Sequence, residues 1–111
     1  MSKAANKTDE SLAGINQDKN LRRATSVMKC LSHPVRLSIL CHLIDKGEMS
    51  AGEIVEYERD KASQSQVSQY LKILRDMKFV NTRREGLTIY YRITSEEISE
   101  LIHTMHGIFC K

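Results

Sequence analysis

The stretch SQSQVSQYLKILRDMKFVNTRREGLTIYYRIT, residues 63–94, joins a two-faced helical pattern to a β-hairpin pattern. Its first half carries an apolar stripe at helical spacing, formed by Val67, Tyr70, Leu71 and Leu74. A second stripe has the same spacing but only polar side chains, namely Ser65, Ser68, Gln69 and Lys72. The two stripes are displaced by two residues, about 200° around a helix. The polar stripe is therefore expected to point away from the core.

The start of this helix and the hairpin after it are both marked in the sequence. Ser63 and Gln66 have capping-box spacing, which predicts that the helix opens at Ser63. The segments 80–84 and 88–93 are rich in β-prone residues, and Glu85-Gly86-Leu87 between them suits a hairpin turn. The stretch therefore predicts a helix followed by a small hairpin.

Four further segments outside this stretch have helical patterns. The spacing of apolar residues predicts a helix from Asp18 to about Leu31 and another from Pro34 to about Lys46, ended by Gly47. A capping box at Ser50 opens a short helix that reaches about Tyr57, and a third box, Thr94-Ser95-Glu96-Glu97, opens the last helix. The predicted order is helix, helix, helix, helix, hairpin, helix. This mainly α fold with a small β-hairpin is a winged helix-turn-helix.

Length and composition limit the organisation of the chain. Residues 1–16 are polar and aperiodic, which predicts a disordered tail, and residues 17–111 are expected to form one DNA-binding and dimerisation domain. The terminal helices each carry an apolar stripe beyond what a three-helix core needs, which predicts a homodimer formed through the first and last helices. The N-terminus lacks the apolar region of a signal peptide, and no apolar run would span a bilayer. We therefore expect a cytoplasmic protein without membrane association.

The charge of the chain is concentrated around residues 61–92, which carry a net charge of +5, whereas the whole chain carries +3. A basic segment of this kind favours a polyanionic partner. Gln pairs with adenine, Ser adapts to several base edges and Lys reaches phosphate or guanine, so the polar stripe suits the major groove of DNA. Arg83 and Arg84 precede the hairpin tip, from which they could reach the backbone or the minor groove. The alternative is an ordinary amphipathic helix with a solvated basic face.

Two motifs resemble the ArsR/SmtB family of dimeric bacterial repressors. They are LSHPVRLSILCHL, residues 31–43, and the stretch 63–94, and the resemblance extends over residues 21–111. It implies a double-stranded operator as partner, with Gln64, Ser65, Gln66, Ser68 and Gln69 reading bases and Lys72, Arg83 and Arg84 supporting them. Lys78 departs from the family pattern, because a helix-ending Gly is usual there, and the turn is expected to be strained or reshaped.

The ligands of the family's metal sites are missing. The region 49–58 has no Cys or His, and Ser95, Glu97, Ile108 and Lys111 stand at the positions of the other site. We therefore predict no metal and no cofactor. His103 and His106, three residues apart on the last helix, leave a metal-responsive repressor open as an alternative.

The three cysteines suggest a different switch. Their odd number and the lack of a CxxC pair argue against a disulfide scaffold or a zinc knuckle. The placement of Cys41 in ILCHL and of Cys110 in Phe109-Cys110 resembles a subgroup of BigR-, SqrR- and HlyU-like regulators. This resemblance implies that the two thiols face each other and become bridged by a disulfide or polysulfide, which releases the operator. The effector would be a persulfide or an oxidant.

Two other functions remain open from the sequence. A regulator with silent thiols could compete with another repressor for DNA. A thiol peroxidase or reductase is disfavoured, because the chain has no CxxC and no cofactor loop, so we expect no enzyme. Cys30 receives no role from the sequence.

Overall fold

The computed structural model describes residue 14 and residues 17–110, which belong to two compact units divided between His33 and Pro34. The expected tail, residues 1–16, lies outside the described residues except for Gly14. The single domain expected over 17–111 stays a prediction. Within the described residues, no helix combines the length and the apolar character needed to cross a membrane.

The first unit contains one described long helix, α2 (Asp18–Leu31), which matches the predicted range. Its first turn holds Asp18 and its last turn holds Lys29, so both charges oppose the helix dipole. The N–H of Ser32 donates to the carbonyl of Met28 and closes the helix. Leu21 and Met28 are exposed although they are apolar.

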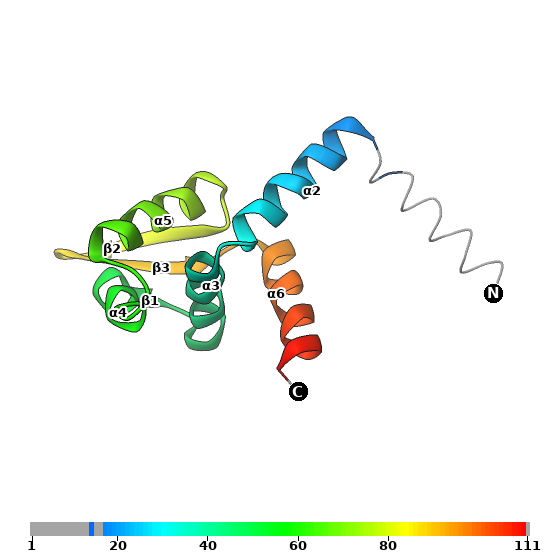
Figure 1. Cartoon of the computed structure of the whole chain (residues 1–111). Helices are drawn as coiled ribbons and strands as arrows, with labels where there is room; N and C mark the ends of the chain where they lie inside the picture. Colours follow the sequence, from blue (N-terminus) through cyan, green and yellow to red (C-terminus); the bar gives the residue numbers. More distant parts are fainter. Residues whose placement is uncertain (1–13, 15–16, 111) are drawn as a thin grey trace. The chain divides into compact units, whose positions relative to one another are not determined.

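The second unit has the predicted order of helices and hairpin, with one further short strand (Figure 1). Its elements are α3 (Pro34–Lys46), β1 (Met49–Ser50), α4 (Ala51–Tyr57), α5 (Gln64–Asp76), β2 (Val80–Glu85), β3 (Thr88–Ile93) and α6 (Glu96–Phe109). This arrangement confirms the predicted winged helix-turn-helix, in which α4 and α5 are the helix-turn-helix pair and β2–β3 the wing.

Most helix ends form as the sequence predicts. Ser50 and Ser63 each accept the backbone N–H three residues on, while the side chains of Glu53 and Gln66 accept the N–H of the serines, so both capping boxes are complete. α3 ends at Gly47, whose φ of 84° lies in the left-handed region that a side chain resists.

The predicted capping box at the last helix is wrong by one residue. The N-cap of α6 is Ser95, whose hydroxyl accepts the N–H of Ile98 at 3.2 Å. The N–H of Thr94 donates instead to the carbonyl of Phe79 at 3.1 Å and so extends the pairing at the base of the hairpin. Because Thr94 is held by that bond, the helix begins one residue later.

The wing is a two-residue hairpin within a three-stranded antiparallel sheet of order β1-β3-β2. Glu85 pairs with Thr88, so it belongs to the strand rather than to the turn expected from the sequence. Gly86 has a φ of 63° and Leu87 follows with a negative φ, as in a type II′ turn. β1 was not predicted: Met49 and Ser50 pair with Tyr91 and Tyr90, and two residues are too few to show a periodic pattern.

Lys78 closes α5 in a conformation that favours glycine. Its φ is 64°, the only positive φ among the non-glycine residues that the structure describes. The N–H of Lys78 donates to the carbonyl of Arg75, and that of Phe79 to the carbonyl of Leu74, which together form a Schellman motif. The side chains of Leu74 and Phe79 are buried beside it. The strain expected at Lys78 is therefore present, and it costs about 1 kcal/mol.

The core of the second unit is centred on α3, which contacts α5, α6 and β3. Leu40 in its middle has no exposed surface. The other apolar side chains of this unit with at most 4% of their surface exposed come from α3 itself and from the surrounding helices and strands: Ile39, Leu43, Met49, Ile54, Val67, Leu71, Leu74, Val80, Ile98 and Ile102. One helix therefore supports both the helix-turn-helix and the last helix.

Candidate functional site

The outer face of α5 carries most of the residues that were predicted from the sequence to contact bases. Gln64, Ser65, Ser68, Gln69 and Lys72 are all exposed, whereas Val67, Leu71 and Leu74 are buried on the opposite side. We call those five exposed residues the reading face. Lys72 forms an ion pair with Asp76 at 3.1 Å. Because both side chains are mostly exposed, this pair is weak, and Lys72 can leave Asp76 for another anionic partner.

Gln66 differs from the other selected residues of α5. It is exposed, but its side-chain oxygen accepts the N–H of Ser63 at 2.8 Å and completes the capping box. Its first role is therefore to fix the start of α5. Arg75 was not predicted from the sequence to contact DNA, although it continues the polar stripe. It lines a surface hollow with Ser68 and Lys72. Extending the spacing of the stripe by one more turn would have indicated it.

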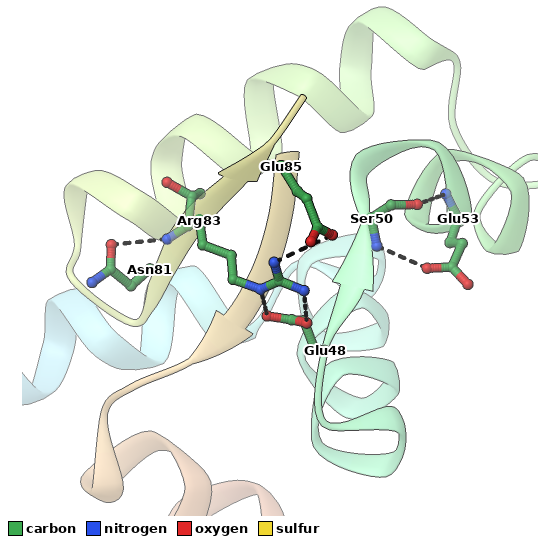
Figure 2. Close-up of polar contacts among 7 residues, drawn as sticks. Glu48, Ser50, Glu53, Asn81, Arg83 and Glu85 are labelled. Carbon is green, nitrogen blue, oxygen red and sulfur yellow. Dashed lines mark hydrogen bonds and ion pairs between the residues drawn. The ribbon is translucent and has the colours of Figure 1, made fainter. Parts of the chain in front are cut away.

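Arg83 in the wing contacts two acidic side chains, Glu48 and Glu85 (Figure 2), and one aromatic side chain, Tyr90. Its guanidinium makes two hydrogen bonds to the carboxylate of Glu48, at 2.8 and 2.9 Å, and lies 3.6 Å from Glu85. It also stacks over the ring of Tyr90, 4.3 Å from the ring centroid. The hydrogen bond from Arg83 lowers the pKa of Glu48 and the same bond raises the pKa of Arg83. Arg83 therefore ties the wing to the segment that follows α3.

Arg84 lies on the other face of the hairpin. Strand residues alternate in direction, so Arg84, opposite Ile89, shares a face with Tyr91 rather than with Arg83. Tyr91 lines the hollows that also contain Ser68. Arg84 is exposed and lies on the hairpin face that covers α5. Arg83 and Arg84 were predicted to have the same role, but their surroundings in the structure differ.

A groove of about 490 Å³ lies between α3 and α6, which run side by side (Figure 1). It is lined mainly by apolar side chains, with two cysteines and three titratable groups among them: Leu37, Cys41, Ile44, Asp45, Ile102, His103, Met105, His106, Phe109 and Cys110. We call this the α3/α6 groove. It brings together Cys41 and Cys110, which are far apart in the sequence.

The electrostatic surroundings of the thiols are unequal. Burial raises the pKa of the Cys41 thiol, and the nearby Cys110 and Glu58 act in the same direction. Cys41 and Cys110 are both exposed, and Cys110 follows the last turn of α6. Cys30 belongs to α2 and is buried. A reagent can therefore reach both thiols of the groove, but the raised pKa keeps Cys41 in its less reactive protonated form.

His103 and His106 both line the α3/α6 groove from α6. The Nδ1–H of His103 donates to the carbonyl of Ser99 at 2.8 Å, which leaves only Nε2 for another partner. Over the described range, no three His, Cys, Asp or Glu side chains are grouped so that they could hold a metal ion.

A buried carboxylate adjoins α3 on another side. Glu58, at the end of α4, has no exposed surface, and its Oε2 accepts hydrogen bonds from Ser38 at 2.7 Å and from His42 at 3.1 Å. The His42 ring also packs on Tyr57, with the ring centroids 4.7 Å apart. Nothing local in the charged sequence Glu58-Arg59-Asp60-Lys61 distinguishes the buried Glu58 from its neighbours.

An exposed polar helix after a capped turn, followed by a basic wing, defines the class of winged helix-turn-helix DNA-binding proteins. Comparison with known proteins supports this class and narrows it. Residues 33–82 match the family of bacterial regulatory proteins described as the arsR family.

Curated relatives and solved structures agree with that match. The transcriptional activator HlyU of Vibrio cholerae is 38% identical over 94 residues, which cover 85% of this chain and 84% of that protein. The biofilm growth-associated repressor of Xylella fastidiosa is 36% identical over 95 residues, covering 86% and 81%. Structures of these two proteins have TM-scores of 0.76 and 0.74, covering 86% and 85% of this chain and 100% and 93% of theirs. A structure described as reduced HlyU also has a TM-score of 0.76, at 37% identity, covering 87% and 99%.

This chain belongs to the ArsR family and is a DNA-binding transcriptional regulator, not an enzyme.

Proposed function

We propose that the protein is a homodimeric repressor that releases its operator when Cys41 and Cys110 become bridged by a disulfide or polysulfide. The observation that carries the proposal is the α3/α6 groove, in which both thiols line one apolar cavity. The proximity of Cys110 also contributes to the raised pKa of Cys41, as expected of two ionisable groups that interact.

The reading face supplies the proposed contacts to base edges. Gln64 and Gln69 have the donor and acceptor pair that matches adenine, and Ser65 and Ser68 suit several edges. The side-chain oxygen of Gln66 accepts the N–H of Ser63, so its amide nitrogen is the atom that it would offer to a base. Lys72 and Arg84 support these contacts at the backbone, whereas Arg83 would have to leave Glu48 first.

Exposed apolar side chains support the proposed dimer. On α2 these are Leu21 and Met28, and on α6 they are Leu101, Ile108 and Phe109, the last with 79% of its surface exposed. Such residues on terminal helices favour burial against a second copy. A symmetric dimer would present two reading faces to half-sites about one DNA turn apart.

The bridging chemistry needs an oxidant or a sulfur donor. With a peroxide, two thiols lose two electrons and two protons to form the disulfide, and the peroxide oxygens leave as water or alcohol. With an organic persulfide, a cysteine first receives the sulfane sulfur and releases the donor's thiol. Attack by the second thiolate on the protein-bound sulfur of that persulfide then gives a disulfide and H₂S. Two such persulfides join as a trisulfide, with loss of one H₂S.

The raised pKa of Cys41 suggests the order of these steps. We propose that Cys110 reacts first and that Cys41, whose raised pKa slows a direct attack, resolves the intermediate. The bridge would then join α3, which supports α5, to α6 of the proposed dimer interface. A shift of a few ångströms between the two reading faces would weaken binding to fixed half-sites.

Operator release by the three single cysteine variants tests the proposal. Reduced protein is bound to a duplex selected from random DNA and then treated with hydrogen peroxide or glutathione persulfide. We expect the unmodified protein and Cys30→Ser to release the duplex, and Cys41→Ser and Cys110→Ser to remain bound. Release that persists in either of the last two variants would overturn the thiol switch. Retention by all four proteins would instead support a regulator with silent thiols.

A further inference from the structure

Glu58 occupies an unusual position for a carboxylate. It has no exposed surface, and only one of its oxygens is satisfied: Oε2 accepts from Ser38 and His42, whereas Oε1 accepts no hydrogen bond from any residue that the structure describes. Burying a carboxylate without full pairing opposes folding. A neutral side chain at this position would avoid that cost, so the carboxylate calls for a role besides stability.

The main chain of Glu58 organises the turn that leads into α5. Its carbonyl accepts the N–H groups of Lys61 and Ala62, both at 2.9 Å. Ala62 is buried and directly precedes Ser63, the N-cap of α5. One residue therefore fixes the turn through its backbone and reaches α3 through its side chain.

On α3, the groups that face Glu58 are next to those that line the α3/α6 groove. Ser38 and His42 are four residues apart and share one face of the helix, and both donate to Glu58. Cys41 lines the groove from the adjacent direction, about 100° around the helix. Any rotation or shift of α3 that a bridge at Cys41 imposes must also displace Ser38 and His42.

We infer that Glu58 is a positioning residue that couples α3 to the start of α5, so that a bridge at Cys41 reorients the reading face through the Ser38–His42–Glu58 contacts. The inference rests on the thiol switch proposed above. In this account, the carboxylate of Glu58 and its two donors, Ser38 and His42, transmit the movement of α3 to α5. Removing the carboxylate should leave both the bridge and the reading face intact while uncoupling them.

Two variants and a matched control test the coupling. Glu58→Gln removes the charge at constant volume, and His42→Phe keeps a ring against Tyr57 but removes the Nδ1–H donor. Glu56→Gln makes the same chemical change two residues earlier in the chain, at an exposed site where the carboxylate pairs with Arg59 at 2.9 Å. For each protein, the dissociation constant for a selected duplex is measured in reduced and peroxide-bridged forms, and intact mass gives the bridged fraction.

The readout is the ratio of the bridged to the reduced dissociation constant. We expect this ratio to fall at least about fivefold in Glu58→Gln and in His42→Phe, and to be unchanged in Glu56→Gln. A purely structural role would weaken both forms equally and keep the ratio, and that result would overturn the inference. His42→Phe decides the outcome if Glu58→Gln does not fold. If the unmodified protein forms the bridge and still binds the duplex, the thiol switch itself fails.

Discussion

The reading face of α5 and the α3/α6 groove differ in polarity and in how their residues are distributed along the sequence. The reading face is polar, exposed and continuous in sequence, and its geometry follows from one capped helix. The groove is mainly apolar and is formed by two helices whose cysteines are separated by most of the second unit. The first surface is therefore suited to contact DNA directly, and the second to sense a small reagent away from the DNA. α3 contacts the elements of both.

Leu40→Ala should damage both regions at once. Leu40 has no exposed surface and lies on the helix that contacts both α5 and α6. Removing its side chain leaves a cavity that destabilises the fold by about 2–5 kcal/mol. Urea unfolding would measure the loss, and a change below about 1 kcal/mol would show that α3 is not the shared support.

Gln69→Ala should separate the two regions. The side chain is exposed on the reading face, so its loss should weaken operator binding by about 1–3 kcal/mol. The rate of bridge formation at the groove should stay unchanged in the same protein. Titration of a selected duplex and a time course of intact mass measure the two effects. If Gln69→Ala binds the operator as tightly as the unmodified protein, Gln69 does not contact the DNA.

The reactivity of Cys41 should depend steeply on pH. Its pKa is raised, chiefly by burial, so the thiol stays protonated near neutral pH and the thiolate fraction grows as the pH rises. Alkylation of the Cys30→Ser/Cys110→Ser double variant, which retains only Cys41, should accelerate about tenfold for each pH unit between about 7 and 9. A rate that is already constant at neutral pH would contradict the raised pKa.

Lys78→Gly should stabilise the protein without altering either surface. The φ of 64° at this position suits glycine, so the substitution relieves strain and raises the free energy of unfolding by about 1 kcal/mol. Lys46→Gly, at the last residue of α3 where the backbone is helical, should instead destabilise the fold by about 1 kcal/mol. Destabilisation by Lys78→Gly would mean that the lysine side chain contributes more than the backbone costs.

The two wing arginines should differ in a smaller effect. Arg84→Ala should reduce the salt dependence of operator binding by about one phosphate contact, because Arg84 lies on the hairpin face that covers α5. Arg83→Ala should change that slope less, since Glu48 already neutralises its guanidinium. Binding titrations across a salt series measure both slopes. A larger change for Arg83 would show that it leaves Glu48 when DNA binds.

Local patterns in the sequence predict the fold well. The helices, the two complete capping boxes and the hairpin depend on contacts within a few residues, which periodicity and cap chemistry report directly. The failures involve distant partners. β1 depends on pairing with Tyr91, and the start of α6 depends on a bond from Thr94 to Phe79.

The candidate site divides in the same way. The polar stripe of α5 was evident from spacing alone, whereas the pairing of Cys41 with Cys110 came from resemblance to a family. The Arg83–Glu48 contact joins residues far apart in the chain, and the burial of Glu58 depends on Ser38 and His42 of α3. No local pattern distinguishes these two glutamates from solvated ones. Sequence therefore predicts which surface meets DNA better than it predicts how that surface is controlled.

The most direct test of the switch is to identify the bridge itself. The reduced protein is treated with hydrogen peroxide or glutathione persulfide, digested without reductant and analysed by mass spectrometry alongside an operator-binding assay. We predict one cross-linked species that joins the peptides of Cys41 and Cys110, lighter by two hydrogens or heavier by whole sulfur atoms, which accumulates in step with operator release. Release without this cross-link, or the cross-link in protein that stays bound to the operator, would contradict the account.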